Sequence, residues 1–286
     1  MENQMALRLR SSLLSLFKEV FREFTEDRGT LFAAAISFYG LISIIPLMLL
    51  AVGVFGYVIG REGALQNVLA LAGKLIPVGT KELEQILREL SAKSGLLSGL
   101  GLLGLLWTGS QVFVILQQVM NIALHARERV SFLRGRLVAV ATVIVVGALF
   151  ILSIGITSML TAIRSYDVTI RGIGPDDILL FWNIVGILVT VLFSMLAFTI
   201  AYRFLPTRRI GLKGPLVGGV TAGLLFDLAK YVFQYYVAHF STYDRLYGPL
   251  AGIIIIVIWI YYVSLITVIG AEVASIYVRH RVNGKG

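Results

Sequence analysis

Residues 246–271 read LYGPLAGIIIIVIWIYYVSLITVIGA and contain no Asp, Glu, Lys or Arg. A helix needs about 20 mainly apolar residues to cross the hydrocarbon core of a bilayer, so this stretch is long enough to span one. In lipid a helix satisfies its own backbone hydrogen bonds, and the sequence lacks the short alternating segments of a membrane barrel. The stretch therefore predicts a membrane-spanning helix.

The same pattern recurs along the chain, and only one of the other long apolar stretches is interrupted by charge, at Asp227 and Lys230. This series of apolar stretches predicts an all-α, polytopic membrane protein. We expect an N-terminal amphipathic helix at 1–30, a transmembrane domain at 31–278 and a tail at 279–286. The six transmembrane helices are expected at about 31–60, 94–124, 137–163, 178–202, 214–243 and 246–278.

The composition excludes a soluble domain and a disordered chain. Of the 286 residues, 57% are hydrophobic and 14% are charged, whereas soluble domains carry about 25% charged residues and disordered chains are poor in apolar ones. The chain has no cysteine, so disulfides and cysteine-ligated metals are excluded. The net charge of +9 is assigned to membrane orientation, and no nucleic-acid partner is expected.

Lys and Arg are distributed unevenly between the two sets of alternating loops. Sixteen of the 25 fall in 1–30, 125–136, 203–213 and 279–286, and eight fall in the loops between them. Because cytoplasmic loops are enriched in Lys and Arg, this bias predicts that both termini lie in the cytoplasm. No cleavable signal peptide is expected, since the first apolar run is too long for one.

The segment before the first apolar stretch has helical spacing of large apolar side chains. These residues are Leu9, Leu13, Leu16, Phe17, Val20, Phe21 and Phe24. Such a pattern indicates an amphipathic helix, which could either lie on the cytoplasmic membrane surface or pack on the ends of the transmembrane helices.

Ionisable side chains within the apolar stretches are costly in lipid and therefore mark candidate functional positions. Asp227 and Lys230 are three residues apart, so they share a helix face and can pair. The pair could contact a substrate or ion, or it could be a structural ion pair. Glu272 lies near the cytoplasmic end of the last stretch, where a partly solvated, interfacial carboxylate is expected in preference to a buried proton carrier.

Amides and glycines add a second set of expectations. Gln118 and Asn121 lie on one side of the second stretch, together with Gln111, and could bond neighbouring helices or line a polar pathway. Gly214, Gly218 or Gly219, and Gly223 have the small-xxx-small spacing of closely packed membrane helices. The sequence contains no nucleotide-binding loop, nucleophile elbow or metal-spaced cluster, so no catalytic residue, metal or cofactor is predicted.

Several motifs occur together in a consistent order between residues 20 and 275. They are AAAISFY at 33–39, SIIP at 43–46, LWTGS at 106–110, YRFLP at 202–206, GPLVGG at 214–219, YDRLYG at 243–248, WIY at 259–261 and GAE at 270–272. As a set they resemble the YihY/BrkB-type inner-membrane proteins, historically labelled ribonuclease BN-like. The resemblance implies a six-helix protein of the bacterial inner membrane, and it draws attention to Tyr247.

The resemblance also implies the movement of a lipid, because some relatives are linked to serum resistance or envelope lipid export. We therefore expect a transporter-like, non-enzymatic protein that contacts membrane lipids and moves a lipid or amphiphilic solute without an ATPase of its own. The candidate pathway residues are Asp227, Lys230, Glu272, Gln118, Asn121 and Tyr247. Alternatives are a membrane scaffold of an envelope complex and, remotely, a membrane-bound ribonuclease.

Overall fold

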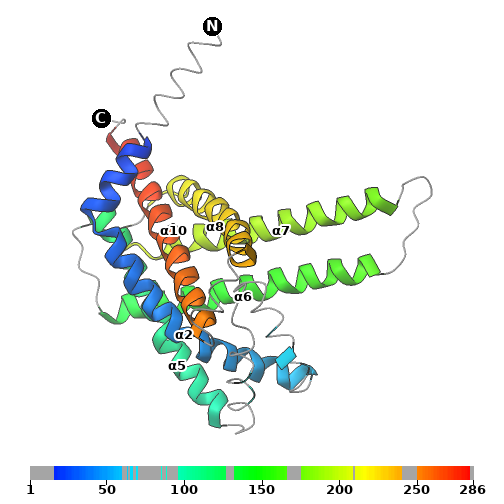
Figure 1. Ribbon diagram of the computed structural model, residues 1–286. Coiled ribbons are helices and arrows are strands. Elements are labelled where there is room, and N and C mark those ends of the chain that lie inside the picture. The colour runs from blue at the N-terminus through cyan, green and yellow to red at the C-terminus, as the bar shows by residue number, and fades with distance from the viewer. Residues whose placement is uncertain are drawn as a thin grey trace.

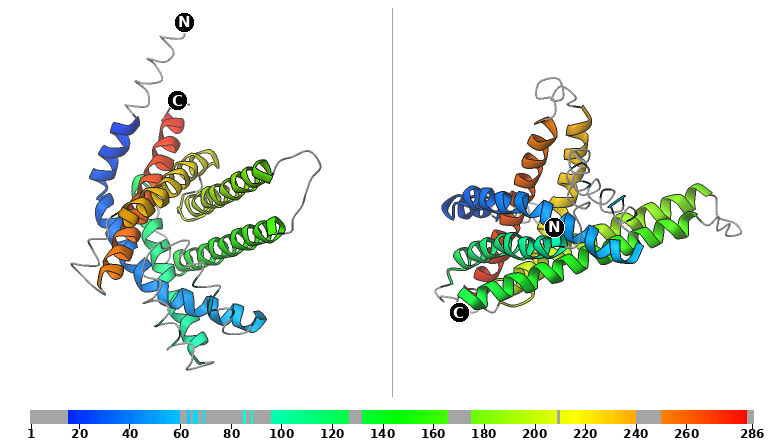
Figure 2. Two further views of the ribbon diagram at one scale, coloured as in Figure 1. Left: turned by 45° about the vertical axis from the view of Figure 1, so that its right-hand side comes forward. Right: turned by 90° about the horizontal axis from the view of Figure 1, so that it is seen from below.

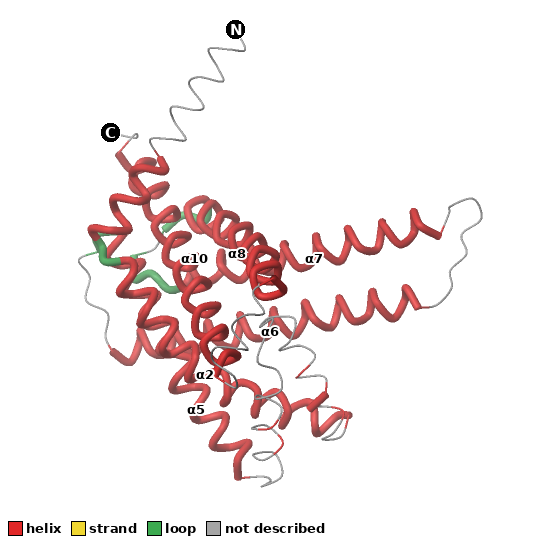
Figure 3. The backbone as a smooth tube through the Cα atoms, in the orientation of Figure 1, coloured by secondary structure: helices red, strands yellow, loops and turns green. Residues whose placement is uncertain are grey.

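A computed structural model of the chain consists of helices joined by turns and loops (Figure 1). The structure describes residues 16–59, 63, 65, 66, 69, 85, 88, 96–126, 132–165, 175–208, 210–239 and 250–283. Within these ranges no residue is in a strand (Figure 3). The prediction of an all-helical protein is confirmed for this part of the chain.

Six long helices coincide with the six apolar stretches of the sequence. They are α2 (Gly29–Ile59), α5 (Leu96–Ala123), α6 (Phe132–Ser165), α7 (Pro175–Phe204), α8 (Lys213–His239) and α10 (Leu250–Asn283). In the described part of the chain, three segments are long and apolar enough to cross a membrane: Ile184–Phe204, Lys213–Tyr236 and Ile254–Arg281. A shorter apolar segment, Gly29–Ile44, belongs to α2.

The last helix, α10, packs against α8, α2 and α5 and also touches α7. Helices α6 and α7 pack along each other and extend well beyond the rest of the bundle (Figures 1 and 2). The first large buried cluster contains side chains from α2, α5, α7, α8 and α10, including Ala33, Met120, Tyr202, Ala222 and Val268. The core therefore lies around α10 and not along the extended α6–α7 pair.

Glycines bring α8 close to both of its neighbours. A Cβ on Gly218 would lie 2.6 Å from that of Ala274 and still closer to the Gly270 carbonyl oxygen on α10. On another side of α8, a Cβ on Gly223 would lie 2.7 Å from Cγ of Met195 on α7. These separations are shorter than real side-chain contacts, so the close packing predicted from the glycine spacing is confirmed.

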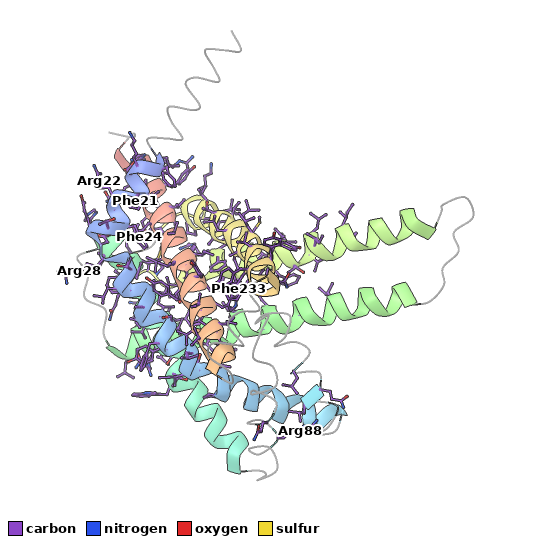
Figure 4. The ribbon with its side chains drawn as sticks, viewed as in Figure 1. Phe21, Arg22, Phe24, Arg28, Arg88 and Phe233 are labelled. Carbon is purple, nitrogen blue, oxygen red and sulfur yellow. The ribbon has the colours of Figure 1, made fainter. Side chains whose placement is uncertain are left out.

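Residues 16–26 form a helix of their own, which a turn at Asp27 and Arg28 separates from α2. Arg28 has a φ of 57°, so the chain changes direction there without a glycine. Phe24 packs against the buried cluster, whereas Phe17 and Phe21 are 71% and 66% exposed. Figure 4 shows Phe21 and Phe24 on this helix. The helix thus has one face against the bundle and a second apolar face directed outward.

One ion pair and one hydrogen-bond contact fasten this N-terminal helix to the end of α10. Glu23 lies 2.8 Å from Arg279, and Glu19 lies 2.8 Å from His280. Of the two placements that the sequence left open, packing on the helix ends is therefore observed, and the outward face of Phe17 and Phe21 leaves room for contact with a membrane as well.

Candidate functional site

An ion pair lies buried on α8, in the middle of an apolar helix. The Asp227 carboxylate is bound by the Lys230 ammonium, one helical turn later in the chain. Its other oxygen accepts a hydrogen bond from the Ser194 hydroxyl of α7 at 2.7 Å. Asp227 is only 6% exposed, and the Lys230 Nζ lies 5.0 Å from the centre of the Phe226 ring. The two charges therefore neutralise each other, with the carboxylate buried and the Lys230 side chain 16% exposed.

The sequence predicted that Asp227 and Lys230 could pair, and the structure places them together. The sequence pattern did not identify Ser194, which is 33 residues away from Asp227 in sequence. A serine in an apolar helix is a weak signal because its hydroxyl usually bonds within the helix, and the Ser194 oxygen also lies 2.8 Å from the Thr190 carbonyl oxygen, which competes with Asp227 for its single proton. Only the packing of α7 on α8 shows that this hydroxyl also reaches the ion pair.

An apolar cavity of about 350 Å³ borders this ion pair and is lined by α2, α5, α6, α7, α8 and α10. Its wall includes Ser194 and Phe226, the two residues that contact the ion pair from α7 and α8. Two other polar wall residues, Ser264 and Thr267, donate to carbonyls of their own helix. The cavity is thus lined mainly by hydrocarbon, with the ion pair immediately behind part of its wall.

A second apolar cavity, of about 600 Å³, lies between α8 and α10. Its wall is rich in aromatic rings, among them Phe233, Tyr236 and Tyr261. Trp259 is 3% exposed and lines both cavities. Its ring centroid lies 4.9 Å from that of Phe233 and 6.1 Å from that of Phe226, so this tryptophan forms the partition between the two spaces.

The amides predicted for the pathway lie elsewhere. The Asn121 side chain accepts a hydrogen bond from the Thr207 backbone at 2.9 Å, and Gln118 is on an exposed face of α5. The neighbouring Gln117, which the sequence did not single out, is buried and donates to the Leu205 carbonyl at 2.6 Å. Asn121 and Gln117 therefore bond the segment after α7. The structure does not bring any of these three amides to Asp227.

Glu272 is fully buried. The expectation of a partly solvated carboxylate was wrong, because this part of α10 lies in the core: Ala271 and Ala274 belong to the buried cluster shared with α2, α5, α7 and α8. Glu272 lies 13 residues beyond Trp259 on α10, which is about 20 Å along a helix. It therefore belongs to a different place in the bundle from the ion pair. Tyr247, the remaining predicted residue, lies outside the described residues.

Among the residues that the structure describes, no group of three or more His, Asp or Glu side chains is placed to hold a metal ion. The polar features are instead an ion pair beside apolar cavities and a separate buried carboxyl group. This arrangement can hold an amphiphilic molecule by its apolar part and present charge to its polar part.

Sequence comparison decides the family. The family model described as "Virulence factor BrkB" matches residues 20–286. The chain belongs to this family. Together with the apolar helices, membership identifies it as an integral membrane protein, and it agrees with the resemblance seen in the motifs.

Curated relatives carry the description "UPF0761 membrane protein". The one from Alkalilimnicola ehrlichii is 29% identical over 273 residues, which cover 93% of this chain and 60% of the relative. The one from Aliivibrio fischeri is 27% identical over 286 residues, covering 96% of this chain and 86% of the relative. The chain thus spans about three fifths of the length of the first of these relatives. No solved structure matches it.

Proposed function

We propose that this BrkB-family protein moves a lipid or amphiphilic solute across the bilayer without an ATPase of its own. The observation that carries the proposal is the buried Asp227–Lys230 pair behind the wall of an apolar cavity. Hydrocarbon packing alone would not require two charges at this depth, and charges within membrane helices commonly mark substrate or ion pathways.

In this proposal the apolar cavities receive the hydrocarbon part of the molecule. Trp259, Phe226 and Phe233 offer a continuous aromatic wall from one cavity to the other. A polar head group would reach the ion pair beside Ser194. A charge on the head group could then replace the contact between Asp227 and Lys230 with a contact to one of these residues. Such an exchange keeps both protein charges paired during passage, which avoids the cost of an isolated ion in a low-dielectric interior.

The proposed topology has six transmembrane helices in the inner membrane, with both termini in the cytoplasm. It is supported by the match between the six helices and the six apolar stretches, and by the excess of Lys and Arg in alternate loops. The pairing of Glu19 with His280 also brings the two ends of the described chain together. An even number of crossings requires both ends on one side.

The experiment is translocation of a fluorescently labelled phospholipid in liposomes that contain the purified full chain. Wild type is compared with Asp227→Asn and Lys230→Met, and the matched controls are Glu26→Gln and Lys213→Met at exposed positions. We expect wild type and both controls to exceed empty vesicles, and the two ion-pair variants to lose most of that excess. Equal rates in empty and protein-containing vesicles would reject lipid movement.

A further inference from the structure

Glu272 is the most unusual ionisable residue in the described part of the chain. Its side chain is fully buried, and neither carboxyl oxygen has a hydrogen-bond partner among the described residues. Buried carboxylates normally accept several hydrogen bonds or pair with a cation, because an uncompensated negative charge is strongly disfavoured away from water. A negative charge on Glu272 would therefore have to be neutralised by something other than hydrogen bonds or a paired cation.

The nearest charged groups do not provide a bonded cation. Glu272 lies within electrostatic range of Asp27, Glu23 and Arg279. The Arg279 guanidinium lies 2.8 Å from Glu23 and 3.3 Å from His125, and its buried Nη2 makes no hydrogen bond among the described residues. Asp27, in the turn before α2, also has a buried carboxyl oxygen without a partner. Glu23, Asp27 and Glu272 thus share the Arg279 guanidinium, and the further cation Arg22 pairs with Glu23.

In the described part of the chain, the printed contacts of α8 and α7 with this part of α10 involve uncharged groups. From α8 come Gly214 and Gly218, which carry no side chain and contact Ala274. From α7 comes the Tyr202 hydroxyl, which donates to the Thr267 carbonyl at 2.8 Å. His280, near the end of α10, is paired with Glu19.

Asp27, in the turn before α2, likewise lies among neighbouring acidic groups that oppose its ionisation. Burial raises the pKa of Asp27, and the neighbouring Glu23 raises it further, although His125 and Arg279 act in the opposite direction. Two carboxyl groups that share a poorly solvated site seldom ionise together, and their titrations become coupled. A proton is the smallest ligand that neutralises one of them, and it needs no coordination sphere.

We propose that Glu272 and Asp27 form a proton-binding site between the turn that precedes α2 and the cytoplasmic end of α10. This inference goes beyond the proposed transport and does not depend on it. Release of the proton leaves an additional negative charge beneath the N-terminal helix, which the Glu23–Arg279 and Glu19–His280 pairs hold in place. The docking of that helix therefore responds to the protonation of the site.

The test is infrared spectroscopy of the full-length protein in lipid nanodiscs, titrated with acid and base. We expect wild type to retain a protonated-carboxyl band at neutral pH, where exposed carboxylates are ionised. Glu272→Gln should lose this band. Asp27→Asn should retain a band that disappears at lower pH, because a neighbouring negative charge has been removed. The matched control, Glu26→Gln, changes an exposed carboxyl group of the same segment and should behave as wild type.

Three outcomes would overturn the proposal. One is a wild-type spectrum without a protonated carboxyl group at neutral pH. The second is a band that neither Glu272→Gln nor Asp27→Asn alters. The third is a band that disappears on adding sodium chloride at constant pH, which would identify a metal-cation site. If Glu272→Gln does not accumulate, the shift in Asp27→Asn decides the question. No lipid movement is measured, so failure here leaves the transport proposal standing, and the reverse also holds.

Discussion

The Ser194 hydroxyl on α7 donates a 2.7 Å hydrogen bond to the Asp227 carboxylate on α8. Asp227 is paired along its own helix with Lys230, so this bond is what connects the ion pair to a second helix. It also connects the ion pair to the cavity, because Ser194 is part of the cavity wall. One hydroxyl therefore contributes both to helix packing and to the candidate site.

Replacing Ser194 by Ala removes this interhelical bond while leaving the ion pair in place. We expect the protein to lose about 0.6 kcal/mol of stability, and at most about 1.7 kcal/mol, as measured for hydrogen bonds between membrane helices. The measurement is reversible unfolding in detergent. Ser37→Ala is the matched control, because the Ser37 hydroxyl bonds only to the Ala34 carbonyl of its own helix in the described structure. Equal losses in both variants would contradict the predicted role of Ser194.

Replacing Gly218 by Ala forces α8 and α10 apart, because the new methyl group would overlap the Gly270 carbonyl and Ala274. We expect a loss of about 1–3 kcal/mol, typical of overpacking. Gly147→Ala on α6 is the control, since no atom lies within 4 Å of its added Cβ. That variant should be neutral or more stable, because alanine favours helix over glycine. Thermal unfolding of both variants gives the comparison.

The Glu23–Arg279 ion pair makes docking of the N-terminal helix sensitive to acid. Burial opposes ionisation of Glu23, but Arg279, with a contribution from Arg22, outweighs it and lowers the pKa of this carboxyl below its usual value. Its stabilisation is therefore complete above the ordinary pKa of a glutamate and is lost as the pH falls through the lowered pKa of the folded state.

We expect amide hydrogen exchange in residues 16–26, corrected for its intrinsic pH dependence, to accelerate in this acidic range for wild type. Glu23→Gln should exchange faster at neutral pH and show little further change on acidification. Glu26→Gln, which changes a carboxyl group that is 65% exposed, should follow wild type. Identical pH profiles for all three proteins would remove Glu23 as the acid-sensitive group.

The outward face of the N-terminal helix is expected to touch the membrane, because Phe17 and Phe21 are exposed there. The chain has no cysteine, so a spin label attached to Phe21→Cys reports a single position. In nanodiscs this label should be more accessible to oxygen, which concentrates in lipid, than to a water-soluble nickel reagent. A label at the exposed position Glu26→Cys, about 140° around the helix from Phe21, should show a smaller preference, and the reverse order would contradict membrane contact.

Local features of the fold were predictable from the sequence. Apolar stretches such as 246–271 identify helices because the backbone of each segment must satisfy its own hydrogen bonds in lipid. The pairing of Asp227 with Lys230 is equally local, since residues three apart in a helix are neighbours. The glycine spacing at Gly214, Gly218 and Gly223 predicted close packing for the same reason.

Features that depend on helix rotation were not predictable. Gln117 and Gln118 are adjacent in sequence, yet one is buried and the other exposed, because successive residues of a helix point in directions about 100° apart. The choice of the inward-facing amide depends on where the segment after α7 lies, and the sequence pattern of α5 contains no information about that segment.

The amino-acid sequence by itself determined a helical membrane protein and a charged pair on one helix face, because both follow from interactions within single segments. Only the tertiary structure decided that Ser194 bonds Asp227 and that Glu272 is fully buried within electrostatic range of Asp27. In each case the partners are far apart along the chain, and their contact arises from the packing of separate helices around α10.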